Sequence, residues 1–316
     1  MPTVTVVIPT HNDGAFIEEA LESVLNQTFR DFEIIVVNDG STDDTEQRLL
    51  KLHERIIYHF QNCKGPSASR NWAIRAAQSP LVAFLDADDL WLPTKLEKQV
   101  RFALANPQYG IVTTDVEWFN ERGVTNPSLK CKYPISNGFV LKDLIFHNWI
   151  ATSAVMVRRE CFGRAGWFDE EPGVFGEDWM MWVQIAAQYQ VYFLDEILAR
   201  RRVRSDSFGQ YDPEAQFQNL FRNLEKLQNS VPELASRPEL FREASYRICM
   251  ARGLRDLQEL NTVAARKKIK RAWEYFPYRP QSWFLFMAAL LPTGLLRAAK
   301  LVRRVRPLHF FITPEN

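Results

Sequence analysis

Short apolar runs alternate with amphipathic stretches along the first third of the chain. The runs are rich in β-branched residues, and each ends at polar turn residues, as buried parallel strands do. They cover residues 4–8, 33–37, 56–60 and 81–85. Apolar residues at helical spacing follow the first run, and residues 68–77 form a second helical stretch. This alternation predicts βαβ units in a doubly wound, mostly parallel α/β sheet.

The pattern continues and then weakens toward the middle of the chain. Pro93 suits the first turn of a helix that ends near residue 106, and residues 110–116 have the pattern of a further strand. From 123 to 148 the periodicity fades while Asn, Pro, Ser and Lys accumulate. We expect a loop-rich segment over one end of the sheet.

Beyond about residue 213 the pattern is helical throughout, with long polar stretches interrupted by prolines. A chain of 316 residues exceeds the usual size of one domain. We therefore predict a main α/β domain at 1–212, with halves of about 1–115 and 116–212, and a helical C-terminal region at 213–316.

Composition excludes several classes of protein. The net charge is +1, from 39 Lys and Arg against 38 Asp and Glu, so no global field recruits nucleic acid. The four cysteines show no zinc-binding spacing and indicate reduced thiols. The N-terminus lacks a signal-peptide pattern, and the longest apolar run, 283–291, is shorter than the roughly 20 residues that span a bilayer. We expect a cytoplasmic protein.

Polar side chains follow the predicted strands at the edge where an open parallel sheet binds its ligands. The candidates after the first, second and fourth strands are Pro9, Thr10, Asn12, Asp39, Asp86 and Asp88. Neither a G-x-G-x-x-G nor a P-loop motif follows any predicted strand, which argues against a dinucleotide-binding fold and a P-loop nucleotidase.

Asp86 and Asp88 form a D-x-D pair directly after the fourth strand. Carboxylates repel a phosphate, but they bind Mg²⁺ or Mn²⁺, which in turn binds phosphate oxygens. The pair therefore predicts a divalent cation that neutralises a diphosphate. The alternative is an ordinary exposed acidic turn.

The ordered set of these segments resembles glycosyltransferase family 2. The matching segments are 6–12 (VVIPTHN), 23–28 (SVLNQT), 36–43 (VVNDGSTD), 65–71 (GPSASRN) and 84–89 (FLDADD). A weaker match continues through 166–170 (GWFDE) and 176–179 (GEDW). The resemblance covers about two thirds of the chain and implies a GT-A fold with an inverting mechanism.

The resemblance also implies roles for residues of the donor half. Pro9, Thr10 and Asn12 would frame the nucleotide, Asp39 would accept hydrogen bonds from its base, and Arg70 would lie near the donor. Asp39 could instead cap its own turn, and Arg70 could be a surface helix residue.

In the same comparison, Asp86 would hold the ribose or the metal, and Asp88 would bind the cation that bridges the two phosphates. A bound cation stabilises the charge that grows on the leaving diphosphate. The cofactor expected from the resemblance is therefore Mn²⁺ or Mg²⁺.

A base must stand near the acceptor hydroxyl for direct displacement. Glu177 and Asp178 begin a largely apolar helical stretch, and the resemblance assigns the base to Asp178. A helix cap is the alternative for such an acid. Trp179 and Trp182 would line a sugar site or belong to the core.

A basic segment, 200–204, follows later in the chain. The family commonly has a histidine near Arg204, where a flexible segment folds over the diphosphate, and this chain departs from that pattern. Arg204 retains the capacity to clamp a phosphate, but a role as metal ligand is lost. A solvated basic loop is the alternative.

Residues 283–306 combine an apolar stretch with several basic residues. Such a segment suits peripheral contact with an anionic membrane, and packing on protein is the alternative. The expected reaction is transfer of a sugar, from a UDP-sugar by preference, to a glycan or a lipid-linked acceptor of the cell surface. The competing functions are a sugar-phosphate nucleotidyltransferase, whose G-G-x-G-T-R-L loop is absent, and a non-catalytic nucleotide-sugar or membrane-binding partner.

Overall fold

The computed structural model describes the chain except for residues 127, 131–134, 172, 174, 205–211 and 294–316. The described residues divide into two compact units. The first contains residues 1–144 and 149–204, and the second contains 145–148 and 212–293.

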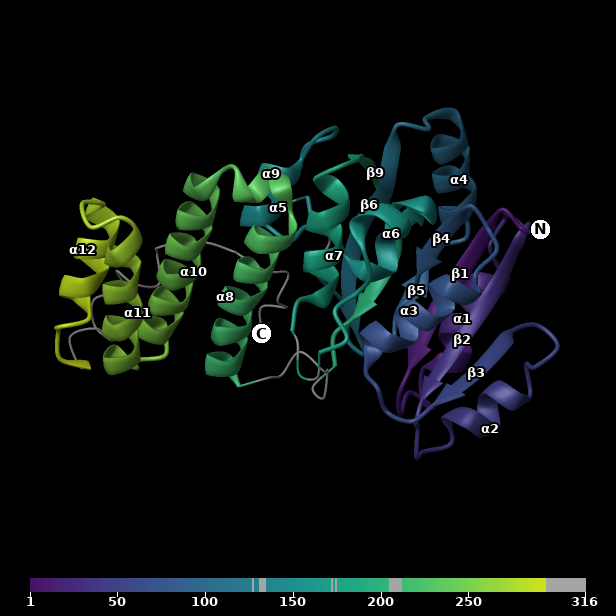
Figure 1. The fold of residues 1–316 in the computed structure, drawn as a ribbon. Coiled ribbons are helices and arrows are strands. Elements are labelled where there is room, and N and C mark those ends of the chain that lie inside the picture. The colour runs from purple at the N-terminus through teal and green to yellow at the C-terminus, as the bar shows by residue number, and fades with distance from the viewer. Residues whose placement is uncertain (127, 131–134, 172, 174, 205–211, 294–316) are drawn as a thin grey trace. The chain divides into compact units, whose positions relative to one another are not determined.

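Nine strands of the described residues form one sheet in the first unit (Figure 1). They are β1 (Val4–Thr10), β2 (Phe32–Asp39), β3 (Ile57–Gln61), β4 (Leu81–Phe84), β5 (Leu90–Trp91), β6 (Tyr109–Asn120), β7 (Gly123–Asn126), β8 (Met156–Arg158) and β9 (Gln190–Arg202). Their order is β3-β2-β1-β4-β8-β6-β9-β5, and β7 pairs with β6 alone.

The sheet is mostly parallel. Strands β1 to β4 run parallel, as do β6 and β9, while β8 lies antiparallel between β4 and β6 and β5 lies antiparallel to β9. Every residue of β1 is buried, so both faces of this central strand are covered. The mixed α/β fold with a mostly parallel sheet confirms the fold class predicted from sequence.

Helices of the first unit follow the strands. Their bounds are α1 (Ile17–Leu25), α2 (Thr45–Leu50), α3 (Pro66–Ala76), α4 (Lys95–Ala105), α6 (Glu160–Ala165) and α7 (Glu177–Ala186), with a 3₁₀ turn η1 at Thr152–Ala154. Helix α3 packs on β1 and β2, α4 on β6 and β9, and α7 on β6. A further helix, α5 (Leu141–Phe146), includes residues of both units.

An aromatic cluster joins β4 to α7 and to the segment before it. The Phe84 ring lies 5.7 Å from Phe168 and 5.9 Å from Trp182, and Phe168 lies 5.7 Å from Trp182. Trp179 and Trp182 are fully buried. Both tryptophans therefore belong to the core rather than to a sugar-stacking surface.

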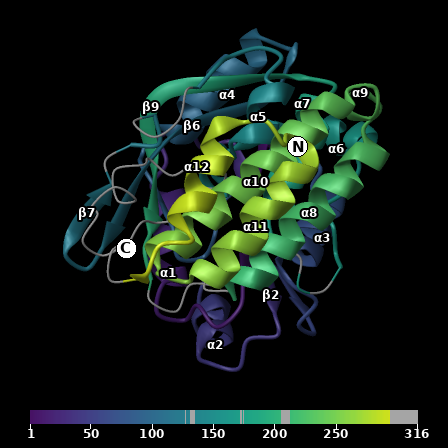
Figure 2. The same ribbon diagram turned by 90° about the vertical axis from the view of Figure 1, so that its left-hand side faces the viewer.

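The second unit is helical, as the sequence predicts. It contains α8 (Pro213–Ser230), α9 (Pro232–Ala235), α10 (Pro238–Gln258), α11 (Thr262–Tyr275) and α12 (Pro280–Ala288). Helices α10, α11 and α12 lie side by side (Figure 2). Gly253 permits close packing, because a Cβ there would lie 2.9 Å from Ile269 Cγ1. Of the helices in the described residues, none has the length and hydropathy to cross a bilayer.

Candidate active site

The carboxyl ends of β1, β2 and β4 meet at one edge of the sheet. Strand β1 lies between the other two, with Thr10 opposite Asn38 and Val7 opposite Phe84. This register brings Thr10, Asp39 and the acidic turn after β4 to the same edge. The strand ends that the sequence selected are therefore neighbours in the structure.

Asn12 holds the loops after β1 and β2 together. Its backbone is in the left-handed region, at φ 57°, which asparagine tolerates better than most residues. Its Oδ1 accepts hydrogen bonds from the backbone of Thr42 at 2.7 Å and Asp43 at 3.3 Å, and its N–H donates to Ser41 Oγ at 3.0 Å. Pro9 is buried in β1. The nucleotide-framing roles of these residues and Thr10 stay predictions.

Asp39 is buried at the end of β2 and anchors the loop that precedes α3. Its carboxylate accepts hydrogen bonds from the backbone N–H groups of Lys64 and Gly65 and from Gln61 Nε2, each at 2.7 Å. The bond that closes its own turn comes instead from Ser41 N–H to Asn38 Oδ1, at 2.9 Å. The alternative of Asp39 as a local cap is therefore wrong, and a role toward the base stays a prediction.

Arg70 links the acidic turn after β4 to the start of α7. It is only 5% exposed on α3, so it is not a surface residue. Its Nη2 donates to Asp86 Oδ1 at 2.9 Å and its Nη1 to Glu177 Oε1 at 3.0 Å. Burial alone would lower the pKa of Arg70, but the charges of Asp86 and Glu177 outweigh it and raise that pKa above its usual value.

Asp88 is partly exposed, and its pKa is shifted strongly by its surroundings. Burial, together with the charges of Asp86 and Asp13, raises the pKa of Asp88 to about 6, although Arg204 opposes the shift. Arg204 Nη1 lies 3.3 Å from Asp88 Oδ2 and 2.9 Å from Asp13 Oδ1. The turn thus concentrates negative charge that a cation would relieve.

Asp89, the third acid of the turn, is a structural residue. It is buried, and its carboxylate accepts hydrogen bonds from Ser153 Oγ at 2.5 Å and from the backbone N–H of Arg202 at 2.8 Å. It therefore joins the end of β4 to η1 and to β9.

The side chains of this edge of the sheet determine how a divalent cation could be held. Across the described residues, no group of three or more His, Cys, Asp and Glu side chains is arranged to hold a metal ion. The side chains of Asp86 and Asp88 are 36% and 23% exposed, and one Asp86 oxygen is engaged by Arg70. Two carboxylates suit a cation that also takes phosphate oxygens from a substrate. The residues fit a shared cation rather than a complete protein site.

Asp178 lies in the first turn of α7, after Gly176 in the left-handed region at φ 82°. Its Oδ2 accepts a hydrogen bond from Thr152 Oγ1 at 3.1 Å, and its Oδ1 accepts from its neighbour's backbone N–H at 2.6 Å. Burial raises the pKa of Asp178 above its usual value. Arg70 forms its ion pair with Glu177 and not with Asp178. Among the described residues, the Asp178 carboxylate takes part in no ion pair.

The first three residues of the basic segment, 200–202, are the end of strand β9 and do not form a loop. Arg200 Nε bonds Glu117 at 2.6 Å, and Arg202 Nη2 bonds Glu19 at 2.6 Å. Arg204 follows the strand and reaches the acidic turn. Residues 205–211, which follow it where the family has its flexible segment, lie outside the described residues. The reading of a solvated basic loop is therefore wrong for the strand residues.

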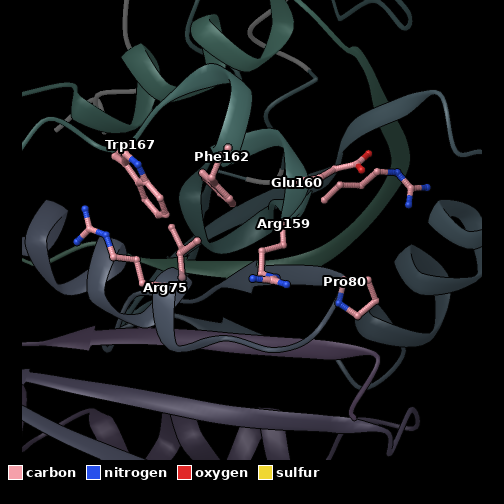
Figure 3. Close-up of a pocket in the computed structure, with 9 residues that line it drawn as sticks. Arg75, Pro80, Arg159, Glu160, Phe162 and Trp167 are labelled. Atoms are coloured by element: carbon pink, nitrogen blue, oxygen red, sulfur yellow. The ribbon is translucent and has the colours of Figure 1, made fainter.

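A pocket of about 640 Å³ lies at the end of β4 that is opposite to the acidic turn (Figure 3). Its lining includes Arg75, Pro80, Arg159, Glu160 and Trp167, and Arg75 stacks on the Trp167 ring at 4.5 Å. Pro80 directly precedes β4, whereas Asp86 and Asp88 follow it. The candidate active site is the acidic edge, because the perturbed carboxylates and Arg70 gather there and not around this pocket.

Sequence comparison matches the family model for glycosyl transferase family 2 to residues 5–162. An uncharacterized glycosyltransferase of Rickettsia felis is 34% identical over 212 residues, 66% of this chain and 34% of that protein. The UDP-Glc:alpha-D-GlcNAc-diphosphoundecaprenol beta-1,3-glucosyltransferase WfaP of Escherichia coli is 38% identical over 104 residues, 32% of this chain and 41% of that protein. The matched part thus spans about a third of the length of the first curated relative.

Two solved structures share the fold. S. aureus TarS 1–349 in complex with UDP-GlcNAc has a TM-score of 0.65 and 20% identity, over 95% of this chain and 88% of that one. The mannosyltransferase PcManGT from Pyrobaculum calidifontis, in complex with GDP-Man and Mn²⁺, has a TM-score of 0.60 and 20% identity, over 95% and 86%.

Proposed function

This chain belongs to glycosyl transferase family 2, and on that premise we propose that it is an inverting transferase of nucleotide-diphosphate sugars. The donor we favour is a UDP-sugar, and the acceptor is a glycan or a lipid-linked precursor of the cell surface. Support comes from the UDP-GlcNAc bound by TarS and from the diphosphoundecaprenol acceptor in the name of WfaP.

One observation carries the proposal: Arg70 forms ion pairs with both parts of the proposed site. It bonds Asp86 of the acidic turn and Glu177, the neighbour of Asp178. A donor held at the acidic turn and an acceptor activated by Asp178 would then be neighbours, as direct displacement requires.

The chemistry follows from the surroundings of each carboxylate. Asp178, held by Thr152 and a backbone N–H, would accept the proton of the acceptor hydroxyl while the acceptor oxygen bonds the anomeric carbon and the bond from that carbon to the diphosphate oxygen breaks. Asp88 and Asp86 would hold Mn²⁺ or Mg²⁺, which supplies positive charge to the leaving diphosphate. Arg70 would keep Asp86 and the start of α7 in register.

The alternative functions have less support. A sugar-phosphate nucleotidyltransferase would need a glycine-rich loop after β1, but Asn12 and its hydrogen bonds occupy that position. A non-catalytic binder would have no use for a half-buried carboxylate with a raised pKa at the position of Asp178.

Thermal denaturation with UDP-, GDP- and dTDP-sugars tests the donor site. One of these sugars with Mn²⁺ should raise the melting temperature, since a ligand at about 100 times its Kd adds roughly 2.7 kcal/mol of stability. The Asp88→Ala variant should lose the metal-dependent part of this shift. The matched control is Asp195→Ala, which removes an exposed acid of β9 that pairs with Lys130. If none of the donors stabilises the parent protein, the proposed function is wrong.

We also propose that the C-terminal segment 283–306 touches an anionic membrane, where a lipid-linked acceptor would be reached. Helix α12 exposes Trp283 by 49%, Phe284 by 50% and Met287 by 60%, residues that recur on one helix face. Such aromatic and apolar side chains suit the interface between headgroups and acyl chains.

The charge distribution supports a membrane as the partner of this face. Residues 262–316 contain eleven Lys and Arg and two acidic residues, a net charge of +9. The whole chain carries +1, so the remaining residues carry −8. A segment with this excess is attracted to anionic lipids by about 1 kcal/mol for each basic residue near the surface.

Flotation of the full chain with vesicles tests the membrane contact. We expect recovery with phosphatidylglycerol vesicles, much less with phosphatidylcholine alone, and a several-fold loss in the Phe284→Ser/Met287→Ser variant. Leu104→Ser, an equally exposed apolar residue of α4, is the control. Unchanged flotation of the double variant would refute the contact through α12, and a dimer that this variant disrupts would assign the face to a second copy.

A further inference from the structure

Alternate arginines of β9 lie on one side of the strand. The Arg200 guanidinium is 4.7 Å from the Phe119 ring, and that of Arg202 is 4.5 Å from the same ring and 4.9 Å from Phe16. Successive side chains of a strand point to opposite faces. Arg201 therefore projects to the other face.

The other cations of this segment already have carboxylate partners. Arg200 pairs with Glu117, Arg202 with Glu19, and Arg204 with both Asp13 and Asp88. Within the part of the chain that the structure describes, Arg201 has neither an ion pair nor a hydrogen bond through its side chain, and it is partly exposed. Its guanidinium has all of its donors available for a ligand.

The backbone places Arg201 beside the acidic turn. The next residue, Arg202, donates its backbone N–H to Asp89 Oδ1 at 2.8 Å and its Nε–H to the Asp88 carbonyl at 2.9 Å. Burial raises the pKa of both Asp88 and Asp178, and the charge of Arg201 is among the influences that oppose this rise at each carboxylate. Arg201 is thus within electrostatic range of the donor turn and of the base.

We propose that Arg201 binds the β-phosphate of the donor, the phosphate bonded to the sugar that is transferred. The inference rests on the proposed function and assigns one of its contacts. A guanidinium can bind phosphate with two parallel hydrogen bonds, and negative charge on this phosphate grows as the glycosidic bond breaks. The phosphate contact that the family resemblance suggested for Arg204 passes to Arg201, because Arg204 is engaged by two carboxylates.

Calorimetric titration with UDP and with UMP, both with Mn²⁺, separates this contact from other losses. The parent protein should bind UDP more tightly than UMP, which lacks the β-phosphate. Arg201→Gln should lower the UDP affinity about tenfold and leave the UMP affinity unchanged, since one charge-assisted contact is lost. The UDP affinity of Arg201→Lys should lie between those of the parent protein and Arg201→Gln, because the lysine ammonium keeps the charge without the bidentate geometry.

Arg200→Gln is the matched control, since it removes a cation of the same strand that pairs with Glu117. It should keep the preference for UDP over UMP. An unchanged UDP affinity in Arg201→Gln would overturn the assignment, as would an equal loss for UMP or a raised acceptor KM with unaltered UDP binding. A parent protein that binds no nucleotide would instead refute the proposed function itself.

Discussion

Replacing Asp178 with asparagine is expected to stop sugar transfer and to leave donor binding intact. The amide keeps the shape of the side chain, and its oxygen can still accept a hydrogen bond from a backbone N–H, as Asp178 does at 2.6 Å. It cannot accept the acceptor's proton, and a positioned base contributes roughly 10² to 10⁴-fold to such reactions. Single-turnover transfer and calorimetric donor binding, measured on the same preparation, check the two halves of this expectation.

The same variant distinguishes loss of a base from loss of the fold. Burial raises the pKa of Asp178 in the folded protein above its usual value, so the free energy of unfolding falls as the pH rises from the unfolded pKa through this raised pKa, and the ionised carboxylate costs stability at pH 7.5. The contribution of this carboxyl group to the free energy of unfolding is fully present below the unfolded pKa and is lost as the pH rises through the folded pKa. The asparagine variant should therefore melt no lower than the parent at pH 7.5.

The pH dependence of transfer gives an independent reading. The active form of the base is the ionised one, so kcat/KM should fall on the acid side at a pH above that of an ordinary aspartate. Normal turnover by Asp178→Asn, or an acid limb that the substitution leaves unaltered, would show that another group is the base.

The carboxyl ends of β1, β2 and β4 could be predicted because their signal is local. A β-branched run followed by polar residues identifies a strand and its carboxyl end at once, and parallel pairing then gathers these ends at one edge. Thr10, Asp39 and the turn at Asp86 are neighbours for this reason. Asn12 was predicted among the polar residues that follow the first strand, and the structure has it there at a φ of 57°.

The connections between these ends could not be read from the chain. Asp39 is held by backbone N–H groups of residues 64 and 65, and backbone donors leave no trace in residue identity. Arg70 and Glu177 are 107 positions apart, so only the fold reveals their ion pair. Strand β8 has three residues, too few to show a period.

Strand β9 illustrates a different limit. Its last residues are arginines, so this part of the chain lacks the alternation of apolar and polar residues that indicates a strand. They are stabilised by aromatic rings and carboxylates supplied from elsewhere, such as Phe119 and Glu117. The sequence therefore suggested a loop where the structure has a strand, and the difference between Arg201 and its neighbours was invisible before the strand was known.

Arg70→Met is expected to have the largest effect on stability and to remove activity with it. The methionine fills much of the same volume but leaves the carboxylates of Asp86 and Glu177 without their shared cation. Breaking a buried ion pair by removing one partner typically costs about 3 to 5 kcal/mol. Because the Asp86 end is partly exposed, we expect a loss toward the lower end of that range, measured by urea denaturation.

Two further variants decide whether the ion pairs are the cause. Arg75→Met lies on the same helix, but the Arg75 side chain is 53% exposed and lies 3.8 Å from its partner Glu170, so it should change the free energy of unfolding by well under 1 kcal/mol. Adding Glu177→Gln to Arg70→Met removes one orphaned charge and should recover part of the stability, but not the transfer activity, since Asp86 and α7 stay uncoupled. Equal effects of Arg70→Met and Arg75→Met, or no recovery in the double variant, would mean that Arg70 acts through packing and that the two halves of the site are held together by something else.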